Sequence, residues 1–224
     1  MENNQFTVII GDLIDSRKIS DRDVFSGTLN SVLKSVTILF KSAFYAIPNL
    51  TGIDGLSVVL YEPAMSYKFC RAFNERIYPE QFRFAIVNGK LDVGVESRES
   101  GKMDGIAFHK ASGLIESMKI SRNKNININE KTNKNKYYRF EIKEEGRFNE
   151  ILDELTNLTH LFRMGLTGRQ RDVFYAYSML RNQTEVANKL GITQQAVSIS
   201  LRRAHYEDIT RAEEFVDILL SEVN

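Results

Sequence analysis

The sequence predicts an α+β protein in which a mixed α/β region is followed by a region made only of helices. Short β-branched apolar runs alternate with amphipathic stretches in the first part, whereas from Phe148 onward apolar residues recur only at helical spacing. The chain has 224 residues, a length that suits one large domain or two small ones. We therefore expect an α/β domain at 1–146 and a helical domain at 147–224.

Composition supports a folded chain and excludes several classes of protein. Hydrophobic residues make up 42% and charged residues 26%, a balance typical of globular domains. No apolar run approaches the ~20 residues that span a bilayer, and the N-terminus lacks the basic flank of a signal peptide. The single cysteine, Cys70, excludes an internal disulfide and a cysteine-built zinc site. We expect a cytoplasmic protein that makes no membrane contact.

The elements of the first region follow from two periodicities. Alternating or continuous short apolar runs predict strands at 6–10, 43–47, 56–61, 82–87 and 137–143. Apolar residues at helical spacing predict helices at 21–41, 64–76 and 104–118.

Turn-forming residues supply the connections between these elements. The first helix is expected to be capped by Ser20 or Asp21, and the stretch 48–55 is rich in turn formers. Asn88-Gly89 is a strong signal for a two-residue hairpin, so residues 90–95 are expected to pair back as a strand. The asparagine-rich stretch 121–136 has the composition of an exposed loop, and the alternation at 125–129 also fits a short edge strand.

Two short helices that meet at a tight turn are predicted within 166–206. Val186 and Ala187 give the first helix an apolar face, and the small Ala187 allows a second helix to approach closely. Gly191 stands where the chain reverses, a position at which left-handed backbone costs little only for glycine. Thr193 suits the N-cap of the second helix. This is the pattern of a helix-turn-helix, whose second helix enters the major groove of DNA.

The second of these helices divides into an apolar and a polar side. The apolar side is expected to hold Ala196, Val197, Ser200, Leu201 and Ala204. On the other side, glutamine can bond adenine edges, arginine can bond guanine edges or phosphates, and serine and threonine can do either. We predict that double-stranded DNA is contacted by six side chains, Thr193, Gln194, Gln195, Ser198, Arg202 and Arg203.

The stretches 166–174 and 184–204 together resemble the DNA-binding segment of sigma-factor region four and of LuxR-type response regulators. The resemblance covers about 40 residues and implies a transcriptional regulator. Two other interpretations remain open: a helical hairpin used only for packing, and a module that binds a protein partner. The last helix, at 208–223, fits a homodimer contact and a cover for its own domain equally well, since helix-turn-helix proteins often bind two half-sites.

A second set of motifs lies in the first region, at Gly11-Asp-Leu-Ile-Asp-Ser-Arg17, 51–57, 83–89 and 104–111. Together these segments resemble the SatD family of small bacterial proteins, which have an N-terminal Gly-Asp-x-x-x-Ser-Arg motif and often a C-terminal helix-turn-helix. The resemblance covers nearly the whole chain. We expect the first domain to sense a ligand or to bind a partner.

The order of elements also resembles the palm domain of nucleotide cyclases and diguanylate cyclases, so we expect a ferredoxin-like or palm-like sandwich. In that family two aspartates hold magnesium ions against a triphosphate, and the resemblance implies Asp12 and Asp54 as the metal ligands here. Arg17 and Lys110 would then contact phosphate oxygens of a bound nucleotide. A magnesium-dependent nucleotide-binding or cyclase-like enzyme is therefore the alternative to a DNA-binding regulator.

One motif departs from the cyclase pattern. The family's hairpin reads Gly-Asp-Glu-Phe, whereas this sequence reads Ile53-Asp-Gly-Leu56. The missing glutamate removes a charge where the transition state needs stabilisation, which argues against catalysis. Asp12, Asp15 and Asp54 also suit turn and cap positions, and binding of a nucleotide or metal without turnover lies between these interpretations.

Overall fold

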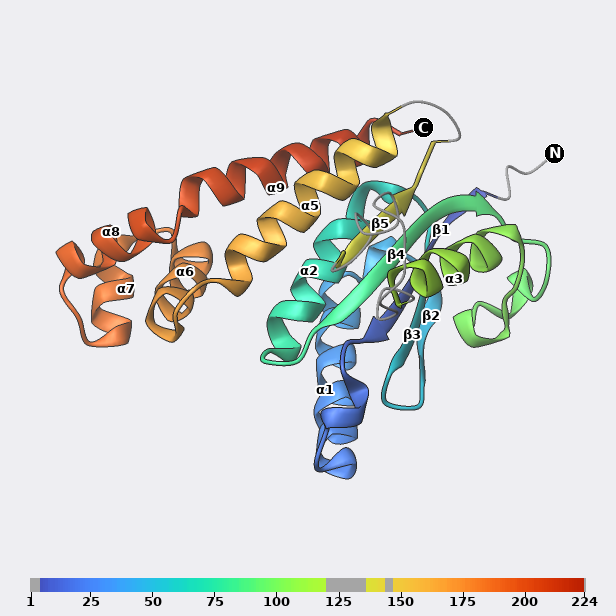
Figure 1. Ribbon diagram of the computed structural model, residues 1–224, viewed down its shortest axis with the longest axis horizontal. Helices are drawn as coiled ribbons and strands as arrows, with labels where there is room; N and C mark the ends of the chain where they lie inside the picture. The colour runs from blue at the N-terminus through green and yellow to red at the C-terminus, as the bar shows by residue number, and fades with distance from the viewer. Residues whose placement is uncertain (1–4, 120–135, 144–146, 224) are drawn as a thin grey trace, which may run out of the picture. The chain divides into compact units, whose positions relative to one another are not determined.

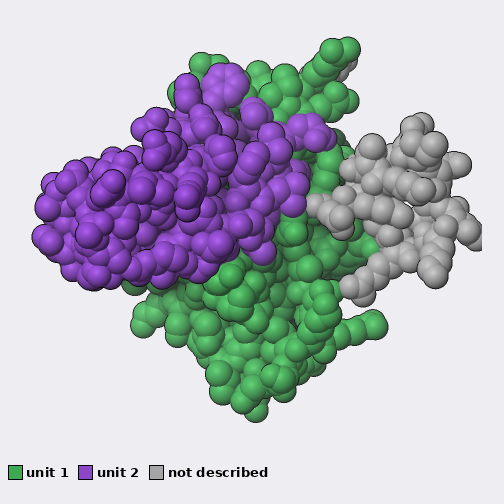
Figure 2. Space-filling view, turned by 60° about the vertical axis from the view of Figure 1, so that its left-hand side comes forward, with its two compact units in different colours: residues 1–153, 217–224 green, residues 154–216 purple. Residues whose placement is uncertain are grey.

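The computed structural model describes residues 5–119, 136–143 and 147–223, and the chain divides into two compact units (Figure 2). The first unit comprises Met1–Asp153 and Asp217–Asn224, and the second comprises Glu154–Val216. The strands of the described residues all lie in the first unit, and helices follow them along the chain. The predicted α+β class is therefore confirmed.

A mixed sheet of five strands forms the centre of the first unit within the described residues. Its strands are β1 (Gln5–Leu13), β2 (Phe44–Thr51), β3 (Gly55–Leu60), β4 (Phe82–Lys90) and β5 (Tyr138–Glu141). They lie in the order β2-β3-β1-β4-β5. β1 is antiparallel to both β3 and β4, β2 is antiparallel to β3, and β5 is parallel to β4.

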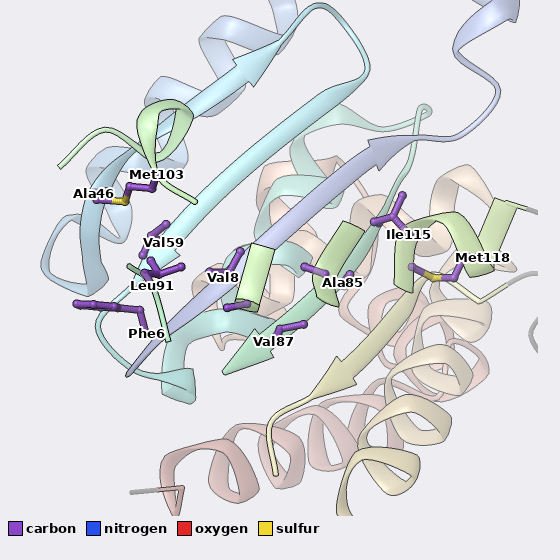
Figure 3. Close-up of a cluster of buried hydrophobic side chains, with 12 residues drawn as sticks. Phe6, Val8, Ala46, Val59, Ala85, Val87, Leu91, Met103, Ile115 and Met118 are labelled. Atoms are coloured by element: carbon purple, nitrogen blue, oxygen red, sulfur yellow. The ribbon is translucent and has the colours of Figure 1, made fainter. Parts of the chain in front are cut away.

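Helices cover both faces of this sheet (Figure 1). α1 (Arg22–Leu39) and α2 (Ser66–Ile77) pack against each other on one face, where the ring of Phe73 meets that of Phe82 edge-on at 5.1 Å. α3 (Ile106–Lys119) covers the other face. Side chains alternate along β1, so Phe6 and Val8 join the α3 core shown in Figure 3.

Short 3-10 turns connect several of these elements. They are Ser16–Lys18, Lys41–Ala43, Pro63–Met65, Val95–Ser97 and Ser100–Lys102. The predicted N-cap of α1 is confirmed, since the Asp21 carboxylate accepts a hydrogen bond from the amide of Val24 at 3.0 Å. The predicted loop at 121–136 lies outside the described residues except for Lys136.

The predicted hairpin at Asn88-Gly89 is wrong. β4 continues straight through both residues, which pair with Thr7 and Phe6 of β1. Lys90 is the last residue of β4, and residues 91–95 form no strand; Val93 makes only an isolated bridge to Asp104. The long-range ladder with β1 satisfies the backbone of Asn88 and Gly89, and this outweighs their local preference for a turn.

The turn-rich stretch 48–55 also differs from expectation, because β2 extends through Pro48 to Thr51. Proline is tolerated here because β2 is the edge strand and its missing N–H interrupts no second ladder. The pairing with β3 shifts register between Ala46 and Asn49, which accommodates the interruption.

From Phe148 the chain is helical, as predicted. Its helices are α5 (Phe148–Met164), α6 (Gly168–Leu180), α7 (Gln183–Leu190), α8 (Gln194–Arg203) and α9 (Tyr206–Ser221). In the parts of the chain that the structure describes, none of the helices has both the length and the apolar character that a membrane crossing requires.

Candidate functional site

The turn between α7 and α8 is built as its sequence predicts. Gly191 has φ of 63°, in the left-handed region, and α7 ends there. The amide of Ile192 donates to the carbonyl of Ala187 at 3.0 Å, and the amide of Gly191 donates to that of Asn188 at 3.4 Å. These two bonds form a Schellman motif, which satisfies the last carbonyls of the helix. The two helices are thus joined by a short turn with defined hydrogen bonds.

The start of α8 is fixed by Thr193, as predicted. The Thr193 hydroxyl oxygen accepts a hydrogen bond from the amide of Ala196 at 3.1 Å. The hydroxyl hydrogen of Thr193 is not used in this bond, so the side chain keeps the ability to donate to an acceptor. α8 therefore begins at a fixed residue and in a fixed direction relative to α7.

The buried side of α8 packs into the core shared by α6, α7 and α9. Val197 has no exposed area, and Leu201 and Ala204 are buried in the same cluster. Ser200 is half-buried. Ala196 was expected on this side but is exposed, because it lies in the first turn of α8 and turns away from the cluster. Packing therefore fixes which side of α8 faces outward.

Every one of the predicted DNA contacts is exposed, on α8 or at its N-cap. Six side chains are exposed, Thr193, Gln194, Gln195, Ser198, Arg202 and Arg203. Burial of these groups against the rest of the unit would have excluded a binding role. Their arrangement supplies amide, hydroxyl and guanidinium groups along one helix, with amide groups at its N-terminal end and guanidinium groups at its C-terminal end.

The charge around this pair of helices is locally positive. Between residues 181 and 203 the sequence contains four basic residues and one acidic residue, Glu185. The acidic side chains next along the chain, Glu207 and Asp208, begin α9 and share with Arg202 a hollow of about 310 Å³. The chain from α7 to the end of α8 thus favours an anionic partner, and the start of α9 does not.

A buried ion pair connects the helices that pack behind this surface. Arg163 of α5 donates from Nε and Nη2 to the two carboxylate oxygens of Glu213 in α9, at 2.5 and 2.7 Å. Both side chains are nearly inaccessible to solvent. The Arg163 guanidinium also lies 4.6 Å from the ring centre of Phe174 in α6. The side chain of Arg163 therefore connects α5 with both α6 and α9.

The second candidate site lies at the end of β1 in the first unit, around Asp12. One carboxylate oxygen of Asp12 lies 2.8 Å from Nζ of Lys119, and the other lies 3.4 Å from Nε of Arg83. Partial burial acts to lower the pKa of Lys119, but its hydrogen bonds to Asp12 and Glu116 outweigh this effect and raise that pKa. Both oxygens of Asp12 face a cation, so a magnesium ion at this carboxylate would compete with Lys119 and Arg83.

The glycine before Asp12 has a packing role. A side chain at Gly11 would place its Cβ 2.9 Å from Cε1 of Phe84 and 3.2 Å from Cδ1 of Phe82. Glycine at this position allows the two rings to lie against the backbone of β1. The Gly-Asp pair is thus explained by packing on one face of the sheet and by ion pairing on the other.

The other predicted nucleotide and metal residues are only partly brought together. The carbonyl of Asp54 accepts a hydrogen bond from the amide of Leu13, at 2.9 Å, so Asp54 lies at the same end of the sheet as Asp12. Arg17 is exposed in the turn that follows β1. Lys110 instead forms an ion pair with Glu141, and it lies nine residues before Lys119, about 13 Å along α3.

No carboxylate cluster suitable for a metal is present in the described part of the chain, where three or more His, Cys, Asp or Glu side chains nowhere gather for that purpose. Sequence reasoning did not find the cations that face Asp12. Arg83 and Lys119 come from another strand and another helix, so no local pattern indicates them.

The comparisons with known proteins assign no family to the chain. No protein-family model matches the chain, and no curated protein matches it significantly.

Proposed function

We propose that the chain is a DNA-binding protein and a transcriptional regulator, which reads duplex DNA through α8. The observation that carries the proposal is the exposure of five polar side chains of α8 and of its N-cap Thr193, while Val197 and Leu201 of the same helix are buried in a core. With ten residues, α8 is about 15 Å long, and an α-helix fits the major groove, which is about 12 Å wide.

Each exposed group has a chemical role in this proposal. Gln194 and Gln195 bond adenine edges, since a primary amide both donates and accepts. Arg202 and Arg203 bond guanine edges or phosphates. Thr193 and Ser198 donate hydroxyl hydrogens to phosphates or base edges. Under this proposal α7 and α8 form the helix-turn-helix that the resemblance to sigma-factor region four implies.

The first unit serves in this proposal as a sensory or interaction domain. Four antiparallel neighbours in the order β2-β3-β1-β4, with α1 and α2 on one face, support the ferredoxin-like or palm-like arrangement that the resemblances imply. The pairing of Asp12 with Lys119 and Arg83 favours a binding role over magnesium catalysis.

The proposal is tested by titrating the full chain against random-sequence duplex DNA at several salt concentrations. Phosphate contacts make the logarithm of the association constant fall linearly with the logarithm of salt. The Arg202→Ala/Arg203→Ala variant is expected to bind roughly 10- to 100-fold more weakly and to lower the salt slope by about 2.

The matched control is Lys34→Ala/Lys90→Ala, which removes two exposed cations from the first unit. This control is expected to leave both the affinity and the slope unchanged. Absence of DNA binding by the wild-type chain at low salt, or equal binding by the two double variants, would reject the proposal.

A further inference from the structure

The outward side of α8 carries a line of residues nearly opposite its buried line. The buried line runs along the helix to its C-cap and holds Val197, Leu201 and Ala204. The residues two positions before each of these are Gln195, Ile199 and Arg202. Because two residues of an α-helix turn by about 200°, these three side chains leave α8 on the side away from the core. The centre of the outward side is therefore an isoleucine.

Ile199 is half-buried, but the core behind α8 does not explain its burial. Among the residues that the structure describes, neither the buried cluster around Val197 nor the apolar side chains packed against that cluster include Ile199. Its neighbours one helical turn away, Gln195 and Arg203, are polar and exposed. The accessible part of Ile199 thus lies between groups proposed to contact DNA.

Ala196 extends this apolar area by one side chain. It stands three residues before Ile199, a spacing at which helical side chains are neighbours, and it is exposed. We call Ala196 and Ile199 the α8 apolar pair. Neither side chain can form a hydrogen bond with a phosphate or with a polar base edge. The pair therefore suits a partner that presents an apolar group beside hydrogen-bonding groups.

One base presents such a group in the major groove of DNA. Thymine carries its C5-methyl group there, and the adenine paired with it offers a donor and an acceptor that glutamine can bond. A G·C pair presents no methyl group. Between residues 181 and 203 four basic residues stand against one acidic residue, so the charge around the pair also fits DNA.

We infer that the α8 apolar pair contacts thymine methyl groups in the major groove, and that Gln195 bonds the neighbouring adenine edge. The preferred duplex then has A·T base pairs opposite the centre of α8, and Ile199 is a specificity-determining residue. Phosphate contacts supply affinity for any duplex, whereas the pair supplies the preference for one sequence. This inference rests on the proposed DNA-binding function.

The test begins with selection of tightly bound duplexes by the full chain, from a random-sequence pool of about 20 base pairs. The selected duplexes are expected to share A·T pairs. One of them is then compared with the same duplex in which deoxyuridine replaces thymidine, a change that removes only the C5-methyl groups. Burial of one methyl group is worth roughly fourfold in affinity, so loss of one or two contacted methyl groups should weaken binding roughly 4- to 15-fold.

Variants show whether the pair is responsible for this discrimination. Ile199→Ala is expected to bind the two forms of the duplex equally, within about twofold. Ala196→Ser should lose part of the discrimination. The control is Met179→Ala, at an exposed apolar residue of α6, which should keep all of it. Because discrimination is a ratio of two affinities of one protein, a variant that is only partly folded lowers both affinities and leaves the ratio unchanged.

The outcomes separate this inference from the function on which it rests. Failure of the wild-type chain to bind any duplex of the pool at low salt would reject DNA binding, and the inference with it. Three other results would overturn the inference alone: binding without enrichment of A·T pairs, equal wild-type affinity for the thymidine and deoxyuridine duplexes, and full discrimination by Ile199→Ala.

Discussion

The end of β1 in the first unit and α8 in the second both carry charged side chains, but these are paired with each other at β1 and exposed on α8. At the end of β1, Asp12 faces Lys119 and Arg83, so acid and base satisfy each other. On α8, Arg202 and Arg203 are exposed beside uncharged polar side chains. Charges that already have protein partners stabilise a fold, whereas cations presented on a rigid helix are available to an anionic ligand.

The comparison shows why charged residues in a motif do not by themselves indicate a catalytic site. Asp12 follows a glycine at the end of a strand, which is where a magnesium ligand of the palm type would stand. Its neighbours in space are the cations Arg83 and Lys119. The exposure of the polar side chains of α8 likewise depends on the tertiary structure, because Val197 of the same helix is buried in the core.

The largest expected effect concerns the ion pair behind α8. Glu213→Gln leaves the buried Arg163 guanidinium without its counter-charge, and loss of one partner of a buried pair costs about 3–5 kcal/mol. Urea unfolding followed by circular dichroism should show this loss in the transition of the helical unit. The control is Glu214→Gln, one residue further on and exposed, which should change stability by less than about 0.5 kcal/mol. Equal effects would show that the charge of Glu213 is not buried.

A smaller effect is expected from pH, through His160. Burial, followed by the charges of Arg163 and Arg171, lowers the pKa of His160 from 6.5 to about 3. The unfolded chain therefore binds a proton between pH 6.5 and 3 that the folded chain does not, so stability falls as the pH is lowered through this window. From pH 7 to 5 the loss attributable to His160 is about 2 kcal/mol.

The measurement that checks this prediction is the difference in pH dependence between the wild-type chain and His160→Gln. The variant should be less sensitive to acid between pH 7 and 5, whereas His109→Gln, which changes an exposed histidine, should behave as the wild type does. A parallel pH dependence in all three proteins would show that His160 titrates normally.

The smallest effect is expected at the end of β1. Asp12→Asn leaves Arg83 and Lys119 facing each other without the carboxylate, which should lower stability by about 1 kcal/mol, since the pair is partly exposed. Magnesium with a nucleoside triphosphate should not raise the melting temperature of the wild-type chain. A rise that Asp12→Asn abolishes would favour the enzyme alternative, because a ligand that binds the native state must stabilise it.

Local chemistry was predictable from sequence where a single residue decides the backbone. Gly191, Thr193 and Asp21 take the turn and cap positions that their side chains favour. Prediction failed where segments distant in the sequence determine the local structure. Pairing with β1 keeps Asn88-Gly89 in an extended strand. The ion pair between Lys119 and Asp12 joins residues far apart in the sequence, and no local sequence pattern indicates it.

The last helix illustrates a third case, in which the apolar spacing fits two different roles. The apolar spacing at 208–223 fits a homodimer contact and a cover for its own domain equally well. In the structure Val216 and Leu220 of α9 are buried, while Phe215 and Ile218 of the same helix are 50% and 52% exposed. Spacing alone does not reveal which of two apolar faces a fold has already covered.

The most direct test of the central claim is a map of backbone amide chemical shifts in the full chain during titration with duplex DNA of about 20 base pairs. DNA recognition through α8 predicts the largest changes at residues 193–203 and negligible changes at 5–13, the strand that ends beside Asp12. Changes concentrated at the end of β1, with α8 unaffected, would contradict that claim.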